Sequence, residues 1–148
     1  MYSTDSPFAE GIGCGYCHAD YHDSWASSKH AQAAKDPFVL DLYTGTGAQG
    51  SVPAQGPGWL LDNPGEAGPC ANCHAPTAAL AAPNGTRLDE VSGVHRNGVF
   101  CESCHKVADV GNPEATPVTG AFRYWRPENG VLMAFGPLDD AGDEHFLC

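Results

Sequence analysis

Six of the seven cysteines of this 148-residue chain lie in three segments with the order Cys-x-x-Cys-His. Residues i, i+3 and i+4 share one face of a helical turn, so the two thiols can add to the two vinyl groups of one haem while the imidazole reaches its iron. The pattern therefore predicts three covalently attached c-type haems. The attachment residues are Cys14, Cys17 and His18 for the first, Cys70, Cys73 and His74 for the second, and Cys101, Cys104 and His105 for the third.

Other uses of paired cysteines fit this pattern less well. Two Cys-x-x-Cys pairs could close a zinc site, but zinc does not require a histidine directly after every second cysteine. Disulfides within such short segments would be poor staples for a chain of this length, and one cysteine would be left over. A thioredoxin-like pair needs a strand-helix-strand context, of which the sequence gives no sign.

The sixth coordination position of each iron is normally filled by histidine or methionine. Beyond the three motif histidines the chain offers His22, His30, His95 and His145, against two methionines. Because histidines are in better supply, we expect mainly bis-histidine ligation, with His30, His95 and His145 as the distal ligands. Their haems should have lower potentials than a haem with a methionine ligand, since a thioether raises the potential.

An expected helix over residues 18–35 narrows these assignments. His22 would lie one turn after His18 on the same face, so the two could not bind opposite sides of one haem. We expect His22 at a haem edge, bonded to a propionate or to a neighbouring protein. His30 would lie about 18 Å from His18 along the axis, at 1.5 Å per residue, and should therefore serve a different haem or a neighbouring subunit.

The composition indicates where the core must come from. The chain has 18 Gly and 12 Pro and is 42% hydrophobic, which is poor material for a core of side chains. Besides residues 18–35, we expect helices around the second motif, continued through 76–82, and over 101–109, with a Gly-rich loop at 44–58. The predicted fold class is a compact multihaem cytochrome made mostly of short α-helices and loops, with the haems as its core and little or no β-sheet. Residues 1–148 would form a single trihaem domain.

The charge and hydropathy exclude two classes of protein: nucleic-acid binders and membrane-spanning proteins. The formal net charge is −11 and the seven basic residues are scattered, so a nucleic-acid binder is excluded. No run approaches the roughly 18 apolar residues of a membrane span. The acidity would steer a basic redox partner, or would serve solubility alone. Thioether attachment requires haem and reduced thiols outside the cytoplasm, so we expect a periplasmic or extracellular location.

Two segments resemble a known family. Residues 18–31, with the order W-x-x-S-x-H-A, are similar to the opening of the multihaem cytochrome family that includes the tetrahaem cytochrome c-554, the electron acceptor of hydroxylamine oxidation. The resemblance implies that His30 is an axial ligand. Residues 98–105 resemble the family's G-V-x-C-E-x-C-H block, with His95 just upstream.

The end of the chain departs from the family pattern. Residues 135–140 resemble what often precedes a further haem motif, but the sequence stops at Cys148, where that motif would begin. Three interpretations are open: these residues are the N-terminal part of a larger multihaem chain, Cys148 forms a disulfide, or it is a free thiol. Under the first, His145 could serve a haem that is attached further along.

The expected function is electron transfer through the three haems. One alternative is a multihaem oxidoreductase with an open haem site, acting on a small nitrogen or sulfur compound. Another is a subunit of an extracellular cytochrome filament, of a homo-oligomer or of a membrane-associated redox complex. No lysine replaces a motif histidine, as the pentahaem nitrite-reducing enzymes would require, and histidines suffice for full ligation. We therefore expect an electron carrier rather than an enzyme.

Overall fold

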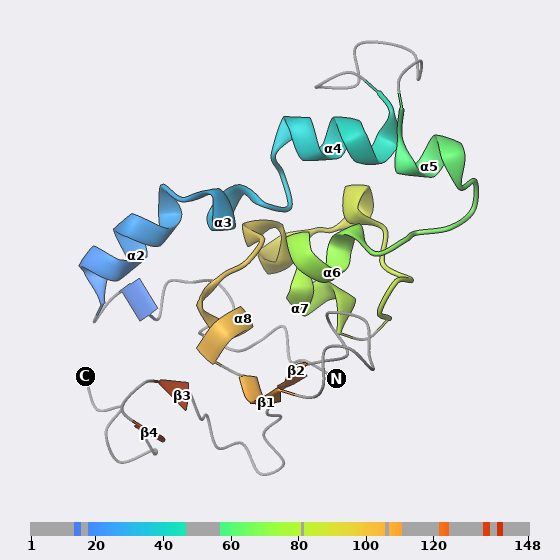
Figure 1. Ribbon diagram of the computed structural model, residues 1–148. Helices are drawn as coiled ribbons and strands as arrows, with labels where there is room; N and C mark the ends of the chain where they lie inside the picture. Colours follow the sequence, from blue (N-terminus) through green and yellow to red (C-terminus); the bar gives the residue numbers. More distant parts are fainter. Residues whose placement is uncertain are drawn as a thin grey trace. The chain divides into compact units, whose positions relative to one another are not determined.

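The computed structural model describes two compact units. The first is formed by segments Met1–Ser24 and Phe100–Cys148, and the second is Trp25–Val99. The described residues are 14–15, 18–46, 57–80, 82–105, 107–110, 122–124, 135–136 and 139–140. In these residues short helices are separated by loops (Figure 1), and the strands form two small two-stranded sheets. The predicted fold of short helices and loops with little β-sheet is confirmed.

The second unit contains most of the helices among the described residues. They are α3 (Lys29–Gln32), α4 (Pro37–Thr44), α5 (Trp59–Asp62), α6 (Cys70–His74), α7 (Pro76–Ala79) and the 3₁₀ helices η1 (Leu88–Glu90) and η2 (Gly93–Asn97). Helix α2 (Ala19–Ala26) begins in the first unit and ends in the second. Within the second unit α4 lies beside α5, η1 packs against both α4 and α6, and α7 packs against α6 and η2 (Figure 1).

The single helix expected over residues 18–35 is wrong, because Ser28 interrupts it. Ser28 has an extended backbone, and its side chain accepts a hydrogen bond from the backbone N–H of Ala31, which makes it the N-cap of α3. Helix α2 has already ended at Ala26. The 18 Å separation of His18 and His30 along one helix axis therefore does not apply.

The remaining expected helices are confirmed in part. Around the second motif, α6 and α7 form as predicted, although α7 ends at Ala79. At the third motif, α8 (Cys101–His105) is shorter than predicted, because β1 (Val107–Val110) follows it directly. Strand β1 pairs antiparallel with β2 (Phe122–Tyr124), a long-range pairing that overrides the local preference for helix. Strands β3 (Phe135–Gly136) and β4 (Asp139–Asp140) form the second antiparallel pair.

The Gly-rich loop lies partly outside the described residues, but its two ends are described. Gly45 ends α4 with a φ of 71°, and its N–H donates to the Asp41 carbonyl. A Cβ on Gly58 would lie 2.5 Å from the Gly45 nitrogen. The two ends of this segment are therefore in contact, and only glycine lets the two backbones come so close.

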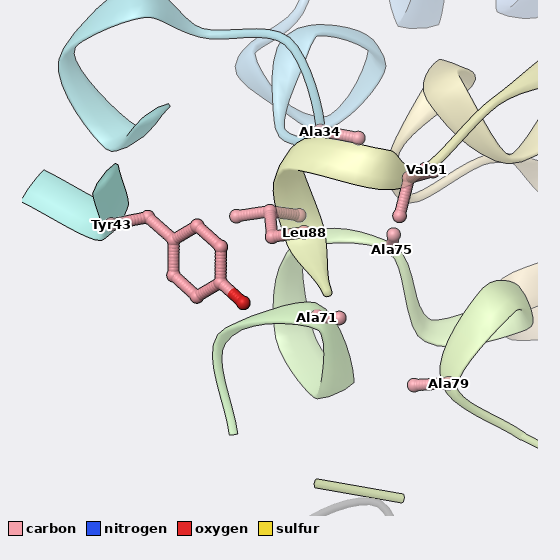
Figure 2. Close-up of a cluster of buried hydrophobic side chains, with 7 residues drawn as sticks. All are labelled: Ala34, Tyr43, Ala71, Ala75, Ala79, Leu88 and Val91. Carbon is pink, nitrogen blue, oxygen red and sulfur yellow. The ribbon is translucent and has the colours of Figure 1, made fainter. Parts of the chain in front are cut away.

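A small cluster of buried apolar side chains stabilises the second unit (Figure 2). Its members are Ala34, Tyr43, Ala71, Ala75, Ala79, Leu88 and Val91. Leu88 projects from η1 between α4 and α6, and the Tyr43 ring reaches toward it from α4. The Tyr43 hydroxyl donates to the Ala67 carbonyl at 2.8 Å, and burial raises the pKa of this phenol. Alanines contribute most of the other members, so α6 and η1 can pack closely.

Truncation of Leu88, which is 1% exposed, tests this core. We expect Leu88→Ala to lower the free energy of unfolding by about 2–5 kcal/mol, because it leaves a cavity between helices. Urea denaturation of the haem-containing protein measures the loss. Leu61→Ala is the matched control, since Leu61 is 42% exposed and its truncation should change stability by no more than about 0.5 kcal/mol. Equal losses in the two variants would contradict the placement of Leu88 at the centre of the core.

Candidate haem-binding sites

The second motif forms one helical turn, α6, with its reactive groups at the surface. Cys73 is exposed, and Cys70 and His74 are half-buried. The Nδ1 atom of His74 lies 3.1 Å from the carbonyl oxygen of Ala33. Because a carbonyl only accepts, Nδ1 carries the proton and the lone pair is on Nε2. This is the protonation state that an iron-binding imidazole needs, and the carbonyl is the kind of partner that orients it.

The two residues between the cysteines anchor α6 to the unit. Ala71 and Asn72 are buried, and Asn72 exchanges two hydrogen bonds with Asn84. The Asn72 side-chain NH₂ donates to the Asn84 side-chain oxygen at 2.6 Å, and the Asn84 backbone N–H donates to the Asn72 side-chain oxygen at 3.1 Å. The side that carries Cys73 therefore faces outward. Burial raises the pKa of the Cys70 thiol.

The third motif, in the first unit, repeats this arrangement on α8. Its two middle residues, Glu102 and Ser103, are buried, whereas Cys104 and His105 are exposed. The Ser103 hydroxyl accepts a hydrogen bond from the backbone N–H of Phe100, which stabilises the start of the turn. In both motif helices the intervening residues thus point inward while the second cysteine stays accessible. The donor sets at α6 and α8 fit a haem attached from outside.

The first motif lies against the third within the first unit. The helical bond from the His18 N–H to the Cys14 carbonyl, 2.8 Å long, shows that this segment also forms a turn. The Cys14 thiol donates a hydrogen bond to the Cys101 sulfur, which raises the pKa of Cys14 and lowers that of Cys101 to about 6. The first cysteines of two motifs are therefore in contact. Cys17 lies outside the described residues.

The backbone of His30 is fixed by the segment that precedes the third motif. The Val99 N–H donates to the His30 carbonyl at 3.0 Å, and the Trp25 indole N–H donates to the Val99 carbonyl at 2.8 Å. Gly98 has a φ of 66°, and a Cβ there would lie 2.5 Å from the His30 oxygen. Ala31, the next residue, is buried. In the W-x-x-S-x-H-A pattern, Trp25 thus acts as a hydrogen-bond donor, Ser28 as the N-cap and Ala31 as a buried residue, whereas the His30 side chain is exposed.

The other histidines differ in their surroundings. His95, on η2, is half-buried, and burial lowers its pKa, so the neutral imidazole is favoured. Its Nδ1 lies 2.9 Å from the Thr77 hydroxyl. The N–H of His22 donates to the His18 carbonyl, so the predicted one-turn relation of these two residues holds. The His22 ring packs against Gly15, where a Cβ would lie 2.9 Å from it. His145 lies outside the described residues.

The structure places His30, His74 and His95 in one unit. The sequence did not predict which residues form hydrogen bonds with them. The Ala33 partner of His74 acts through its backbone, which leaves no mark on residue type. Thr77 could have been noticed as the one hydroxyl in the short segment Pro-Thr-Ala-Ala. The contact of Trp25 with Val99 spans 74 residues, a separation that no local pattern reveals.

A cavity of about 610 Å³ lies next to the second motif but is separate from its reactive groups. It is lined by Trp59, residues 65–69, Asn84, Gly85 and Arg87. Its described lining includes no cysteine or histidine. The Arg87 guanidinium is engaged with Asp89 and Glu90 through ion pairs of 2.7 and 2.8 Å. The candidate haem sites are therefore the outward faces of the motif helices and not this cavity.

Short helices, motif turns with accessible thiols and an oriented imidazole together define a multihaem c-type cytochrome. Residues 13–106 match the family model described as cytochrome c554 and c-prime, and the chain belongs to this family. This membership supports the covalently bound haem c that the three motifs and the family resemblance imply. Within the described residues, no helix has the length and apolarity needed to cross a membrane.

A solved structure agrees with this assignment at the level of the fold. The chain is similar to a penta-heme cytochrome c552 from Thermochromatium tepidum, with a TM-score of 0.55 and 23% sequence identity. The match covers 78% of this chain and 30% of that one, so the chain spans less than a third of the length of this relative. No curated protein matches the sequence.

The close approach of Gly98 to His30 can be tested with two glycines that both have a positive φ. Gly98 and Gly93 have φ values of 66° and 58°, so alanine is strained at both, but a Cβ on Gly93 would have nothing within 4 Å. We expect Gly98→Ala to lower the free energy of unfolding by more than about 1 kcal/mol, and by clearly more than Gly93→Ala, because it also pushes against the His30 carbonyl. Urea denaturation compares them. Equal effects would show that the Gly98 contact is unimportant.

Proposed function

We propose that the protein carries electrons through three covalently attached haems, one at each Cys-x-x-Cys-His motif. The observation that carries this proposal is the shared geometry of α6 and α8, where two buried residues fix the turn and the second cysteine remains accessible. Residues 1–148 would then act as one trihaem domain, whether or not further motifs follow. Haem iron, when bound, supplies the one-electron chemistry by alternating between its ferrous and ferric states.

His18, His74 and His105 are the proposed proximal ligands, and His30, His95 and His145 the proposed distal ones. Two features support the neutral imidazoles that ligation needs: the Ala33 carbonyl fixes the proton of His74 on Nδ1, and His95 is partly desolvated. His30 is supported by the contacts that fix its backbone against Gly98 and Val99. His22 packs on Gly15 within the first motif turn and keeps its proposed place at a haem edge.

The contact between Cys14 and Cys101 supports direct electron exchange between two of the haems. These residues are the first attachment points of the first and third motifs, and their side chains lie in contact. Haems bound at these two cysteines would be attached at neighbouring points of the first unit. The protein would then contribute distance and ligation, while the cofactor carries the electron.

The proposed partners are redox proteins with basic surfaces, because the net charge of −11 would attract them over a range of about 10 Å at moderate salt. Homo-oligomers or a filament, with a histidine donated between neighbouring chains, would serve the same electron-transfer function. A periplasmic or extracellular location is proposed because haem c is attached outside the cytoplasm. A multihaem enzyme with one open iron remains the alternative that spectroscopy distinguishes.

Mass spectrometry of the intact protein tests the number of haems. We expect the mass of the polypeptide plus three haems, because each motif can supply two thioether bonds. Proteolytic peptides that contain residues 14–18, 70–74 and 101–105 should each retain one haem. A motif peptide without haem in the mature protein would contradict the count of three.

Electron paramagnetic resonance of the oxidised protein tests the ligation. We expect only low-spin ferric signals, because six-coordinate iron with two imidazoles is low-spin. A high-spin signal from an intact sample would indicate an open iron site and would favour the enzyme over the carrier.

Replacement of His30 by methionine tests the distal assignment. His30→Met should leave all three haems attached and raise one midpoint potential, because a thioether ligand favours ferrous iron. Spectroelectrochemical titration measures the potentials. His22→Met is the comparison variant and should shift a potential by clearly less than His30→Met does, because His22 is proposed at a haem edge and not as a ligand. If no potential moves in His30→Met, His30 is not a ligand.

A further inference from the structure

Thr77 lies where it can control the ring of His95. It sits on α7, three residues after His74, and is 3% exposed. Its Oγ1 atom is 2.9 Å from the Nδ1 atom of His95 on η2, and the two short helices pack against each other. Both residues belong to the second unit. Moving a hydroxyl from water to a site this buried costs free energy unless it forms a hydrogen bond, so its bond to the imidazole contributes to stability.

The direction of this hydrogen bond decides what the imidazole can do. A threonine hydroxyl can donate or accept. If Oγ1 donates, Nδ1 is the unprotonated nitrogen, the proton is on Nε2, and Nε2 cannot bind iron. If Oγ1 accepts, Nδ1 carries the proton and the lone pair is on Nε2. His74 shows the second arrangement, since its Nδ1 faces the Ala33 carbonyl, which can only accept.

We propose that Thr77 is a positioning residue for His95: its hydroxyl oxygen accepts a hydrogen bond from Nδ1–H and holds the ring so that Nε2 can bind a haem iron. The proposal rests on the proposed function, in which His95 is a distal ligand. It gives the segment from Cys70 to Ala79 a double role. This stretch carries the proximal ligand His74 and, through Thr77, orients a distal ligand from another part of the chain.

The physical effect of Thr77 follows from its chemistry. An acceptor on Nδ1–H makes the imidazole a better donor to iron and fixes the plane of the ring. Loss of such a partner typically weakens metal ligation about 10- to 100-fold. Thr77→Val keeps the shape of the side chain but removes the acceptor, whereas Thr77→Ser keeps the hydroxyl. The two variants therefore separate hydrogen bonding from packing.

Carbon monoxide is the probe, because it competes with a distal histidine for ferrous iron. In the reduced holoprotein we expect Thr77→Val to bind carbon monoxide about 10- to 100-fold more tightly at one haem, with Thr77→Ser close to the unchanged protein. In the oxidised state one low-spin paramagnetic resonance signal should shift while the others stay. Thr86→Val is the matched control, because the Thr86 hydroxyl bonds only backbone carbonyls in the described contacts, those of Ala78 and Ala82.

Three outcomes distinguish this proposal from the one on which it rests. His95→Ala should convert one haem to a high-spin form; if it does not, His95 is not a ligand and the role of Thr77 falls with it. If His95→Ala has this effect but Thr77→Val behaves like the unchanged protein, the role of Thr77 alone is wrong. If Thr77→Val and Thr86→Val have equal effects, the change reflects general loosening and the proposal is overturned.

Nuclear magnetic resonance of the unchanged protein gives a second test that does not depend on a variant folding. Reduced, low-spin haem protein is diamagnetic, so histidine ring protons can be observed. We expect a slowly exchanging Nδ1 proton on His95 with a cross-peak to the Thr77 methyl group. A His95 ring protonated on Nε2 would overturn the proposal.

Discussion

The motif helices α6 and α8 are five residues long, and helices of this length are not stable by themselves in water. Each turn therefore depends on packing and hydrogen bonds with the rest of the protein. At α6 this is done by Ala71 and Asn72, and at α8 by Glu102 and Ser103, all of which are buried. Anchoring the middle of the motif leaves its ends for the cofactor. The haem motif allows any residue at these two middle positions. The fold does not, because each buried side chain must fit its own surroundings.

Two histidines of the second unit are held through backbone carbonyls in one short segment of the chain. The Ala33 carbonyl orients His74, and the carbonyl of His30, three residues earlier, accepts a hydrogen bond from Val99. The short segment around α3 thus contacts both the second motif and the chain that leads into the third. A displacement of α3 would therefore disturb His30 and the hydrogen-bond partner of His74 together.

The sequence was informative where function imposes a local spacing. The three motifs, the short helices and the shortage of core-forming residues could all be deduced, because a haem motif and a proline or glycine each act over a few residues. The continuous helix over 18–35 was wrong because the Ser28 side chain competes for the backbone and begins a new helix. The helix predicted to 109 was wrong because β1 finds its partner at residues 122–124. Thr77 and Ala33 were missed because their partners lie 18 and 41 residues away, one of them through a backbone atom.

The meeting of Gly45 and Gly58 has a consequence for how the protein could be altered. Because the two glycine backbones are in contact, each doubling of the number of residues between them changes the loop-closure cost by only about 0.6 kcal/mol. A peptide tag or a surface-binding sequence inserted between these glycines would offer a way to immobilise the cytochrome on an electrode, because the supports described for the α6 and α8 turns come from residues outside this interval.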